Sequence, residues 1–224
     1  MNNSQISILC PSRGRPELAK KMIDTALATA TIAPEIKLYL NDDDPALSTY
    51  KAIIDSKYYE VGPDRSTCYS WNRLAENAAG DILFLMGDDA EFKTRGWDRR
   101  IVDTFNEYPD KIACVYPITN VVNWQQNHHF CIHKNWVNVV GYFVPPQFWH
   151  YYVDTWIANV AGRLQRLRCL DDVVVSIQKH VNDNAELRLR DNSKVERDTY
   201  IWEKTQRHLD ADEALLRNYI RKFK

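Results

Sequence analysis

Three clusters of polar residues follow apolar runs, at points where the chain is expected to leave a β-strand. Residues 11–16 (PSRGRP) carry two arginines, residues 41–44 (NDDD) carry three acids, and residues 87–89 (GDD) carry two. Two acidic clusters at one sheet edge repel each other unless a cation or hydrogen-bond donors lie between them. A divalent metal with carboxylate ligands fits this pattern, and arginines beside it suit a phosphate. Taken singly, an Asp after a strand is more often a cap or turn residue.

The elements that would position these clusters alternate in the first half of the chain. Apolar runs predict strands at residues 6–10, 36–40, 58–61 and 81–86. Helical periods predict helices at residues 17–29, 47–55 and 68–79. This order is typical of βαβ units around a mostly parallel sheet, in which ligands bind at the carboxyl ends of the strands.

The second half of the chain has a looser pattern. Helices are predicted at residues 97–108 and 199–224, and a strand at residues 112–116. The pattern is irregular or mixed at residues 137–146, 152–165 and 170–179. The sequence therefore predicts one compact α/β domain followed by a long C-terminal helix.

The composition indicates a globular protein. The chain has 224 residues, and its 45% hydrophobic and 26% charged residues exclude disordered and collagen-like architectures. A net charge of −1 gives no overall field for holding a polyanion. No run approaches the roughly 18 apolar residues of a membrane helix, and the N-terminus is polar, so we expect a cytoplasmic protein. The five scattered cysteines suggest neither disulfides nor a zinc site.

Several widespread motifs are absent from the sequence. It has no G-x-x-x-x-G-K-[ST] phosphate loop and no G-x-G-x-x-G dinucleotide fingerprint. It also has no G-x-S-x-G nucleophile elbow. P-loop NTPases, dinucleotide dehydrogenases and α/β-hydrolases therefore lose their main sequence support.

Residues 11–16, the acids at 42–44 and the stretch SWNRLAENAAGDILFLMGDD at residues 70–89 together resemble a known family. They are similar to the nucleotide-sugar domain of GT-A glycosyltransferases of the family 2 type. The resemblance covers residues 5–100 well and the rest loosely. It implies a Rossmann-like GT-A domain over residues 1–198, with a nucleotide-sugar half at 1–100 and an acceptor half at 101–198. A basic amphipathic helix would follow at 199–224.

The resemblance assigns six residues to the nucleotide pocket: Pro11, Arg13, Asp42, Arg65, Asn72 and Asp88. In this assignment Asp42 accepts hydrogen bonds from the base, and Arg65 approaches the base or the phosphates. Asp88 contacts the ribose or a metal-bound water.

The metal site implied by the resemblance holds Mn²⁺ or Mg²⁺ on Asp89, where the ion bridges the diphosphate. Gly87 stands where many members have the first acid of a D-x-D motif, so further ligands are needed. His180, which follows an apolar run, is the second candidate ligand. An exposed or helix-capping role for His180 stays open, because a hard ion prefers oxygen ligands.

The general base is expected in residues 151–156 (YYVDTW), which resemble the segment that carries this acid in the family. Val153 replaces the first acid of that segment, and Asp154 is then the base that activates the acceptor hydroxyl. A role for Asp154 as a helix N-cap stays open, with Asp171 and Asp172 as reserve candidates.

The resemblance implies a metal-dependent glycosyltransferase that uses a nucleoside diphosphate sugar, with UDP favoured, and inverts the anomeric centre. Retention of configuration stays open. The acceptor would be a saccharide, a protein or a modified nucleic-acid base, as for certain phage transferases of this kind. Two alternatives are a catalytically inactive nucleotide or sugar binder, which Gly87 favours, and a nucleotidyltransferase, although residues 11–16 contain only Gly14.

Two features outside these motifs carry open interpretations. Four tryptophans, Trp124, Trp136, Trp149 and Trp156, either stack on an acceptor ring or pack in the core. The basic residues at 215–224 either contact a membrane or nucleic acid, or form the solvated face of a helix packed on the core.

Overall fold

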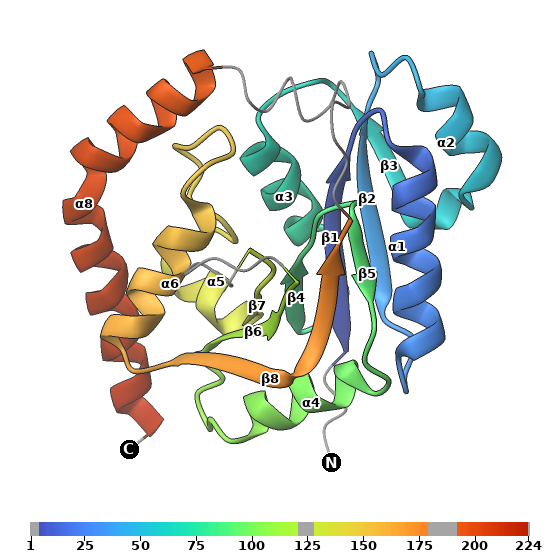
Figure 1. The fold of residues 1–224 in the computed structure, drawn as a ribbon. Helices are drawn as coiled ribbons and strands as arrows, with labels where there is room; N and C mark the ends of the chain where they lie inside the picture. Colours follow the sequence, from blue (N-terminus) through green and yellow to red (C-terminus); the bar gives the residue numbers. More distant parts are fainter. Residues whose placement is uncertain (1–4, 121–127, 179–191, 224) are drawn as a thin grey trace.

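The computed structural model describes residues 5–120, 128–178 and 192–223 (Figure 1). These residues contain an eight-stranded sheet in the order β3-β2-β1-β4-β7-β6-β8-β5. Its strands are β1 (Ile6–Ser12), β2 (Glu35–Asn41), β3 (Tyr59–Gly62), β4 (Ile82–Leu85), β5 (Ala90–Phe92), β6 (Cys114–Ile118), β7 (Cys131–His133) and β8 (Leu167–Ile177). The strand pairing makes six of them parallel to one another, with β5 and β7 reversed. The α/β class and the mostly parallel sheet expected from the sequence are confirmed.

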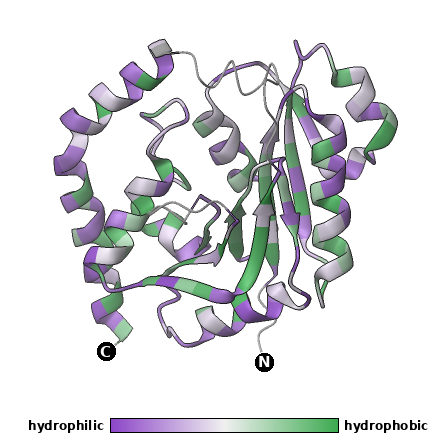
Figure 2. Cartoon of the chain, viewed as in Figure 1, coloured by the Kyte–Doolittle hydropathy of each residue, from purple (hydrophilic) through white to green (hydrophobic). Residues whose placement is uncertain are grey.

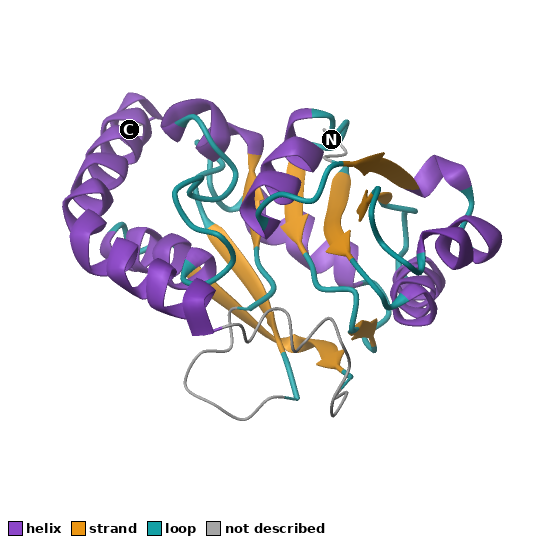
Figure 3. Cartoon of the chain, turned by 90° about the horizontal axis from the view of Figure 1, so that it is seen from above, coloured by secondary structure: helices purple, strands orange, loops and turns teal. Residues whose placement is uncertain are grey.

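Helices cover both faces of the sheet, as the view from above makes clear (Figure 3). One face carries α1 (Pro16–Thr29), α2 (Leu47–Ile53) and α4 (Trp97–Asn106). The other carries α3 (Thr67–Glu76), α5 (Lys134–Val140), α6 (Val153–Arg163) and α8 (Asn192–Ile220). Short 3-10 turns lie at Ser56–Tyr58 and Arg221–Phe223.

The alternation of side chains along the strands divides the core into two layers. On β1, Ile8 packs with the α1 layer and Leu9 with the α3 layer. On β4, Phe84 packs with the α1 layer and Leu85 with the α3 layer. Both faces of β1 and β4 are therefore buried, as expected of central strands in which apolar residues predominate (Figure 2).

The register of the parallel strands brings their carboxyl ends to one edge. Ser12 on β1 pairs with Leu40 on β2, and Leu9 on β1 pairs with Leu85 on β4. The loops that follow these three strands therefore meet beside the start of α3. The Ser66 hydroxyl caps α3 by accepting a hydrogen bond from the Tyr69 amide at 3.0 Å.

The second half of the chain is more regular than its sequence pattern predicts. Helix α5 begins just before residues 137–146, expected to be irregular, while α6 and β8 form where the pattern is mixed. Helix α8 begins at Asn192, so the boundary expected after residue 198 falls inside this helix. Leu209 and Leu216 on α8 are fully buried against α5 and α6, so the C-terminal helix packs on the core of the domain.

Among the described residues, none of the helices is both long enough and apolar enough to cross a membrane.

Candidate active site

A small cavity lies at the carboxyl edge of the sheet. Its volume is about 140 Å³, and its walls come from the loops after β1, β2 and β4, the start of α3, and residues 149–150. Arg13, Arg15, Arg65 and Lys194 line it together with acids that include Asp88. The cavity therefore lies where α/β sheets commonly bind ligands, and cationic side chains outnumber acidic ones in its lining.

Asp88 is the most buried acid of this cavity and holds Arg15 in place. Its side chain is 1% exposed and accepts hydrogen bonds from Ser12 Oγ at 2.6 Å and Arg15 Nε at 3.2 Å. Arg15 Nη2 lies 2.8 Å from the second carboxylate oxygen. Tyr50 completes the cluster by hydrogen bonding to Ser12 Oγ at 2.6 Å and to the Arg15 amide at 2.9 Å. Asp88 thus lines the cavity with its carboxylate already engaged by Arg15 and Ser12.

The acids after β2 hold the loop after β1. Arg13 forms an ion pair with Asp43, and the Gly14 amide donates to Asp44 at 2.8 Å. Asp42 is exposed and does not line the cavity, whereas Asn41 does. The small cavity is therefore lined by Asn41 and not by Asp42, because the last residue of β2 points inward and the next one outward. A contact of Asp42 with the base stays a prediction.

Arg65 lines the cavity, whereas Asn72 does not. The Arg65 guanidinium lies over the Tyr69 ring at 4.6 Å. The Asn72 amide instead fixes the loop after α5: its oxygen accepts from the Phe143 and Val144 amides at 2.9 and 3.1 Å, and its nitrogen donates to the Val144 carbonyl at 2.8 Å. Asn72 thus fixes this loop, and its role as a nucleotide contact stays a prediction.

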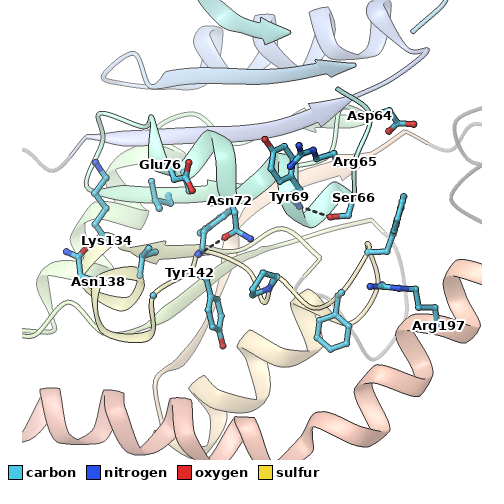
Figure 4. Close-up of a pocket in the computed structure, with 18 residues that line it drawn as sticks. Asp64, Arg65, Ser66, Tyr69, Asn72, Glu76, Lys134, Asn138, Tyr142 and Arg197 are labelled. Carbon is cyan, nitrogen blue, oxygen red and sulfur yellow. Dashed lines mark hydrogen bonds between the residues drawn. The ribbon is translucent and has the colours of Figure 1, made fainter. Parts of the chain in front are cut away.

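A larger cavity of about 950 Å³ runs along α3 (Figure 4). Its lining joins α3 to α5, the loop after α5, and Arg197 on α8. Asp64, Arg65 and Trp149 line both cavities, so the two are neighbours that share one wall. Of the four tryptophans singled out in the sequence, Trp136 and Trp156 are core residues, Trp149 lines the cavities, and Trp124 lies outside the described residues.

The loop that carries Trp149 and His150 is fixed by a buried acid on α8. Asp198 is fully buried and accepts hydrogen bonds from the backbone amides of Trp149, His150 and Tyr151 at 2.8 to 3.0 Å. The His150 ring stacks on Trp71 of α3, with the ring centroids 5.9 Å apart. Helix α8 therefore builds one wall of the small cavity, which its sequence alone gives no sign of.

Asp89 and Gly87 lie beside a second histidine that the sequence analysis missed. The Asp89 side chain is 25% exposed, and one of its oxygens lies 3.9 Å from Arg15 Nη1. A Cβ built on Gly87 would lie 2.7 Å from Asp89 Oδ1 and 3.4 Å from His129 Cε1. The three residues thus border one small space at the end of β4.

The candidate ligand set for a metal is incomplete in the part of the chain that is described. There, no three His, Cys, Asp or Glu side chains form a cluster that could hold a metal ion. His180 lies outside the described residues, which stop at Gln178 of this segment. The Gln178 amide donates to the Asp89 carbonyl at 2.8 Å, so the chain passes beside Asp89 just before His180.

Asp154 lies in the first turn of α6 and faces His128. The N-cap of α6 is Tyr152 and not Asp154, so the capping role left open for Asp154 is wrong. Asp154 Oδ2 lies 3.3 Å from His128 Nδ1, and Oδ1 accepts from the Thr155 amide at 2.7 Å. Burial opposes ionisation of Asp154, but these hydrogen bonds outweigh it and hold its pKa below the usual value. Asp154 is therefore an ionised, partly shielded carboxylate.

The two reserve candidates for a base lie elsewhere. Asp171 and Asp172 are exposed on β8, and neither lines either cavity. Asp172 forms an ion pair with Arg100 of α4, on the opposite face of the sheet from α6.

We expect the protein to lose stability as the pH falls below about 6.5, the ordinary pKa of histidine. Burial lowers the pKa of His129 to about 3 and that of His150 to about 4, so both are neutral in the folded protein. The unfolded chain binds the two protons first, so stability is complete above pH 6.5 and falls with acidity by up to about 1.4 kcal/mol per pH unit for each histidine. Urea unfolding between pH 7.5 and 5 measures this slope.

The matched variants for this measurement are His129→Leu and His208→Ala. His129→Leu removes one of the two histidines that bind a proton when the protein unfolds, so the dependence of stability on pH should become less steep. His208 is exposed on α8, and His208→Ala should leave this dependence unchanged. An equal slope in wild type and His129→Leu would contradict the prediction.

Comparison with sequence-family models and with curated proteins gives no match. Solved structures do match. The mannosyltransferase PcManGT from Pyrobaculum calidifontis, in complex with GDP-Man and Mn²⁺, has a TM-score of 0.64 at 11% identity, over 95% of this chain and 70% of that one. Staphylococcus aureus TarS 1–349 in complex with UDP-GlcNAc has a TM-score of 0.59 at 11% identity, over 81% and 60%.

Glucosyl-3-phosphoglycerate synthase from Mycobacterium tuberculosis, in complex with Mg²⁺ and UDP, has a TM-score of 0.55 at 12% identity, over 83% of this chain and 74% of that one. Of the three proteins, the TarS fragment is matched over the smallest share of its own length, 60%. At this level of identity the likeness concerns the fold, and the chain has the GT-A fold of these glycosyltransferases.

Proposed function

We propose that this protein transfers a sugar from a nucleoside diphosphate sugar, most simply a UDP-sugar, to an acceptor hydroxyl with inversion. The observation that carries the proposal is the small cavity, whose lining combines three arginines with Gly87 and Asp88 at one edge of a GT-A sheet. The structural neighbours solved with GDP-Man, UDP-GlcNAc or UDP support a nucleotide-sugar donor. A saccharide, a protein or a modified nucleic-acid base would be the acceptor.

The arginines would bind the donor diphosphate. Arg15 is immobilised by Asp88 and by the Tyr50 hydroxyl on its amide, and Arg13 is immobilised by Asp43. Cations held in advance of binding stabilise the charge that develops on a leaving diphosphate without reorganising during the reaction. The ion pair with Asp88 also keeps the Arg15 guanidinium at the cavity wall.

Asp89 is the residue in the described part of the chain best placed to hold Mn²⁺ or Mg²⁺. When bound there with the donor, a divalent ion would supply positive charge to the leaving diphosphate. Asp89 lies next to Arg15, so the protein and the ion would share that charge.

Asp154 would act as the general base of a single displacement. A base must be ionised and within hydrogen-bond reach of the acceptor hydroxyl. The hydrogen bonds from His128 and the Thr155 amide favour the ionised form of Asp154. Its place in the first turn of α6 adds the stabilising field of the helix N-terminus.

The proposal is tested by thermal melting with UDP, GDP, CDP and ADP, each with and without Mn²⁺. A ligand at 100 times its Kd adds about 2.7 kcal/mol to stability, which gives a clear shift. We expect a base-selective shift that Mn²⁺ enlarges and that Asp89→Asn reduces. Asp171→Asn, which changes an exposed acid remote from both cavities, is the matched control. If none of the four nucleotides shifts the melting temperature, the proposal is wrong.

His128→Ala is expected to move the acidic limb of the pH–rate profile to higher pH. Removal of the His128 hydrogen bond leaves burial as the main influence on Asp154 and so raises the pKa of Asp154. Since the ionised form is active, the variant should lose activity several-fold on the acidic limb and little above neutral pH. Donor hydrolysis, in which water replaces the acceptor, measures this profile. If the acidic limb of the pH–rate profile lies at the same pH in His128→Ala and in wild type, His128 does not set the pKa of the base.

A further inference from the structure

Two aromatic side chains in the wall of the small cavity carry buried ring nitrogens that make no hydrogen bond. Both Trp71 and His150 line the cavity, and Trp71 is only 6% exposed. Trp71 Nε1 and His150 Nδ1 are buried, and neither has a partner among the described residues. Buried polar groups in native proteins are nearly always hydrogen-bonded, so each exception calls for an explanation. A ligand in the cavity is an explanation that accounts for both nitrogens at once.

The fold holds these two rings against each other in a fixed position. Their planes are inclined by 18° and their centroids lie 5.9 Å apart. The Cys68 amide at the start of α3 donates to the Trp149 carbonyl at 3.2 Å, which ties the loop of His150 to the helix of Trp71. Asp198 accepts the His150 amide at 2.8 Å. Because the pair is ordered before a ligand arrives, little affinity is lost in ordering it.

The hydrogen-bonding capacity of the two rings fits a hydroxyl group. An indole nitrogen only donates, whereas a neutral imidazole carries one N–H and one lone pair. Burial lowers the pKa of His150 to about 4, against the opposing effect of Asp154 and Asp198, so the ring is neutral at pH 7. A hydroxyl oxygen accepts from the indole, and the hydroxyl either donates to or accepts from the imidazole. It therefore complements the pair in either tautomer of His150.

The remaining polar groups of the cavity suit a different part of the ligand. Arg13, Arg15 and Arg65 line the same cavity, and guanidinium groups pair with the oxygens of a phosphate. Trp71 and the neutral His150 carry no charge. The lining thus combines cations for a diphosphate with an uncharged pair for an uncharged group.

We propose that Trp71 and His150 together bind a hydroxyl group of the donor, on its ribose or on the transferred sugar, and so select hydroxylated donors over ligands that lack this group. The inference rests on the proposed function, because it takes the ligand to be a nucleoside diphosphate sugar. A site built to hydrogen-bond a hydroxyl rejects the analogue without it, since the buried polar groups are then left unpaired.

Isothermal titration calorimetry with matched pairs of ligands, all in Mn²⁺, measures what the hydroxyl contributes. UDP and GDP are compared with their 2′-deoxy and 3′-deoxy forms, which tests the ribose. UDP-glucose, UDP-galactose, UDP-N-acetylglucosamine and GDP-mannose are compared with UDP and GDP, which tests the sugar. In at least one class of pairs, wild-type protein should bind the hydroxylated member more tightly, by about two- to tenfold for each hydrogen bond. The class that shows this preference identifies the source of the hydroxyl.

The decisive variants are Trp71→Phe and His150→Phe, which keep an aromatic ring and remove the ring nitrogens. In each, the preference for the hydroxylated ligand should fall by about two- to tenfold, while the ligand without the hydroxyl binds as in wild type. Trp97→Phe is the matched control, because Trp97 Nε1 donates to the Ala26 carbonyl at 3.3 Å in the opposite core layer. It should keep the wild-type preference.

Three results would overturn the inference: no preference in wild type for any pair, an unchanged preference in either decisive variant, or an equal loss of affinity for both members of every pair. With any of these results the donor site stands as long as the ligands bind, and Trp71 and His150 only pack in its wall. If none of the nucleotides or nucleotide sugars binds, the proposed function is wrong and the inference falls with it.

Discussion

Asp154→Asn is expected to lower kcat for sugar transfer by about 10²–10⁴-fold, the range that positioned general bases contribute. Asparagine has nearly the same shape as aspartate, and it can keep the contact with the Thr155 amide that Asp154 makes at 2.7 Å. It cannot accept a proton at neutral pH, so the chemical step alone should suffer. The measurement is kcat for donor hydrolysis and, once an acceptor is found, for transfer.

Donor binding is the control for this prediction. Asp154 lines neither cavity, so the nucleotide-induced melting shift should be the same in Asp154→Asn as in wild type. Asp171→Asn, at the reserve position on β8, should keep full activity because that side chain is exposed and outside the site. Near-normal kcat in Asp154→Asn would exclude Asp154 as the base.

Asp198→Ala is expected to destabilise the protein by about 3–5 kcal/mol, the cost of removing one partner from a buried charged network. The carboxylate is fully buried and accepts backbone amides from Trp149, His150 and Tyr151, while Arg197 donates to it at 2.8 Å. Alanine leaves those amides without their acceptor. For a chain of this size the melting temperature should fall on the order of 10 °C.

The same variant should also weaken nucleotide binding, because Trp149 and His150 line the small cavity. Asp210→Ala is the matched control on the same helix: Asp210 is 74% exposed and pairs with Arg163 at 2.7 Å. Exposed ion pairs contribute only about 0–1 kcal/mol, so its melting temperature should hardly change. If Asp198→Ala and Asp210→Ala lower the melting temperature by the same amount, Asp198 has no special role in holding this loop.

The first half of the fold follows closely from local sequence patterns. Pro16 opens α1, the Ser66 hydroxyl caps α3, and the unbroken apolar run of β4 is buried on both faces. Each of these signals acts within a few residues of the chain. Strands and helices of the first half therefore lie within a few residues of their predicted positions.

The second half depends on contacts that local patterns do not contain. Helix α5 ends at Gly141, whose φ of +91° suits a glycine, in an apolar stretch that was expected to be irregular. Helix α8 continues from Asn192 because Leu209 and Leu216 pack on α5 and α6, and because buried Asp212 accepts the Trp156 indole nitrogen at 2.8 Å. Packing against distant elements decided these boundaries.

The sequence by itself predicted which edge of the sheet carries the polar loops and which acids and arginines lie in them. Arg13, Arg65 and Asp88 follow predicted strands, and parallel strands bring them to one edge, where they line the small cavity. The orientation of a single side chain depends on its exact register, so the sequence alone does not tell that Asn41, and not Asp42, lines the cavity.

Only the tertiary structure showed which residues that are far apart in the sequence lie next to one another. Asp154 and His128 are adjacent in space and separated in sequence, and Asp198 reaches Trp149 from a helix 49 residues further along the chain. His129 meets Asp89 and Gly87 only because β7 pairs with β4. Sequence patterns report local propensity and burial, whereas such meetings depend on how the sheet and helices pack, which has no local signature.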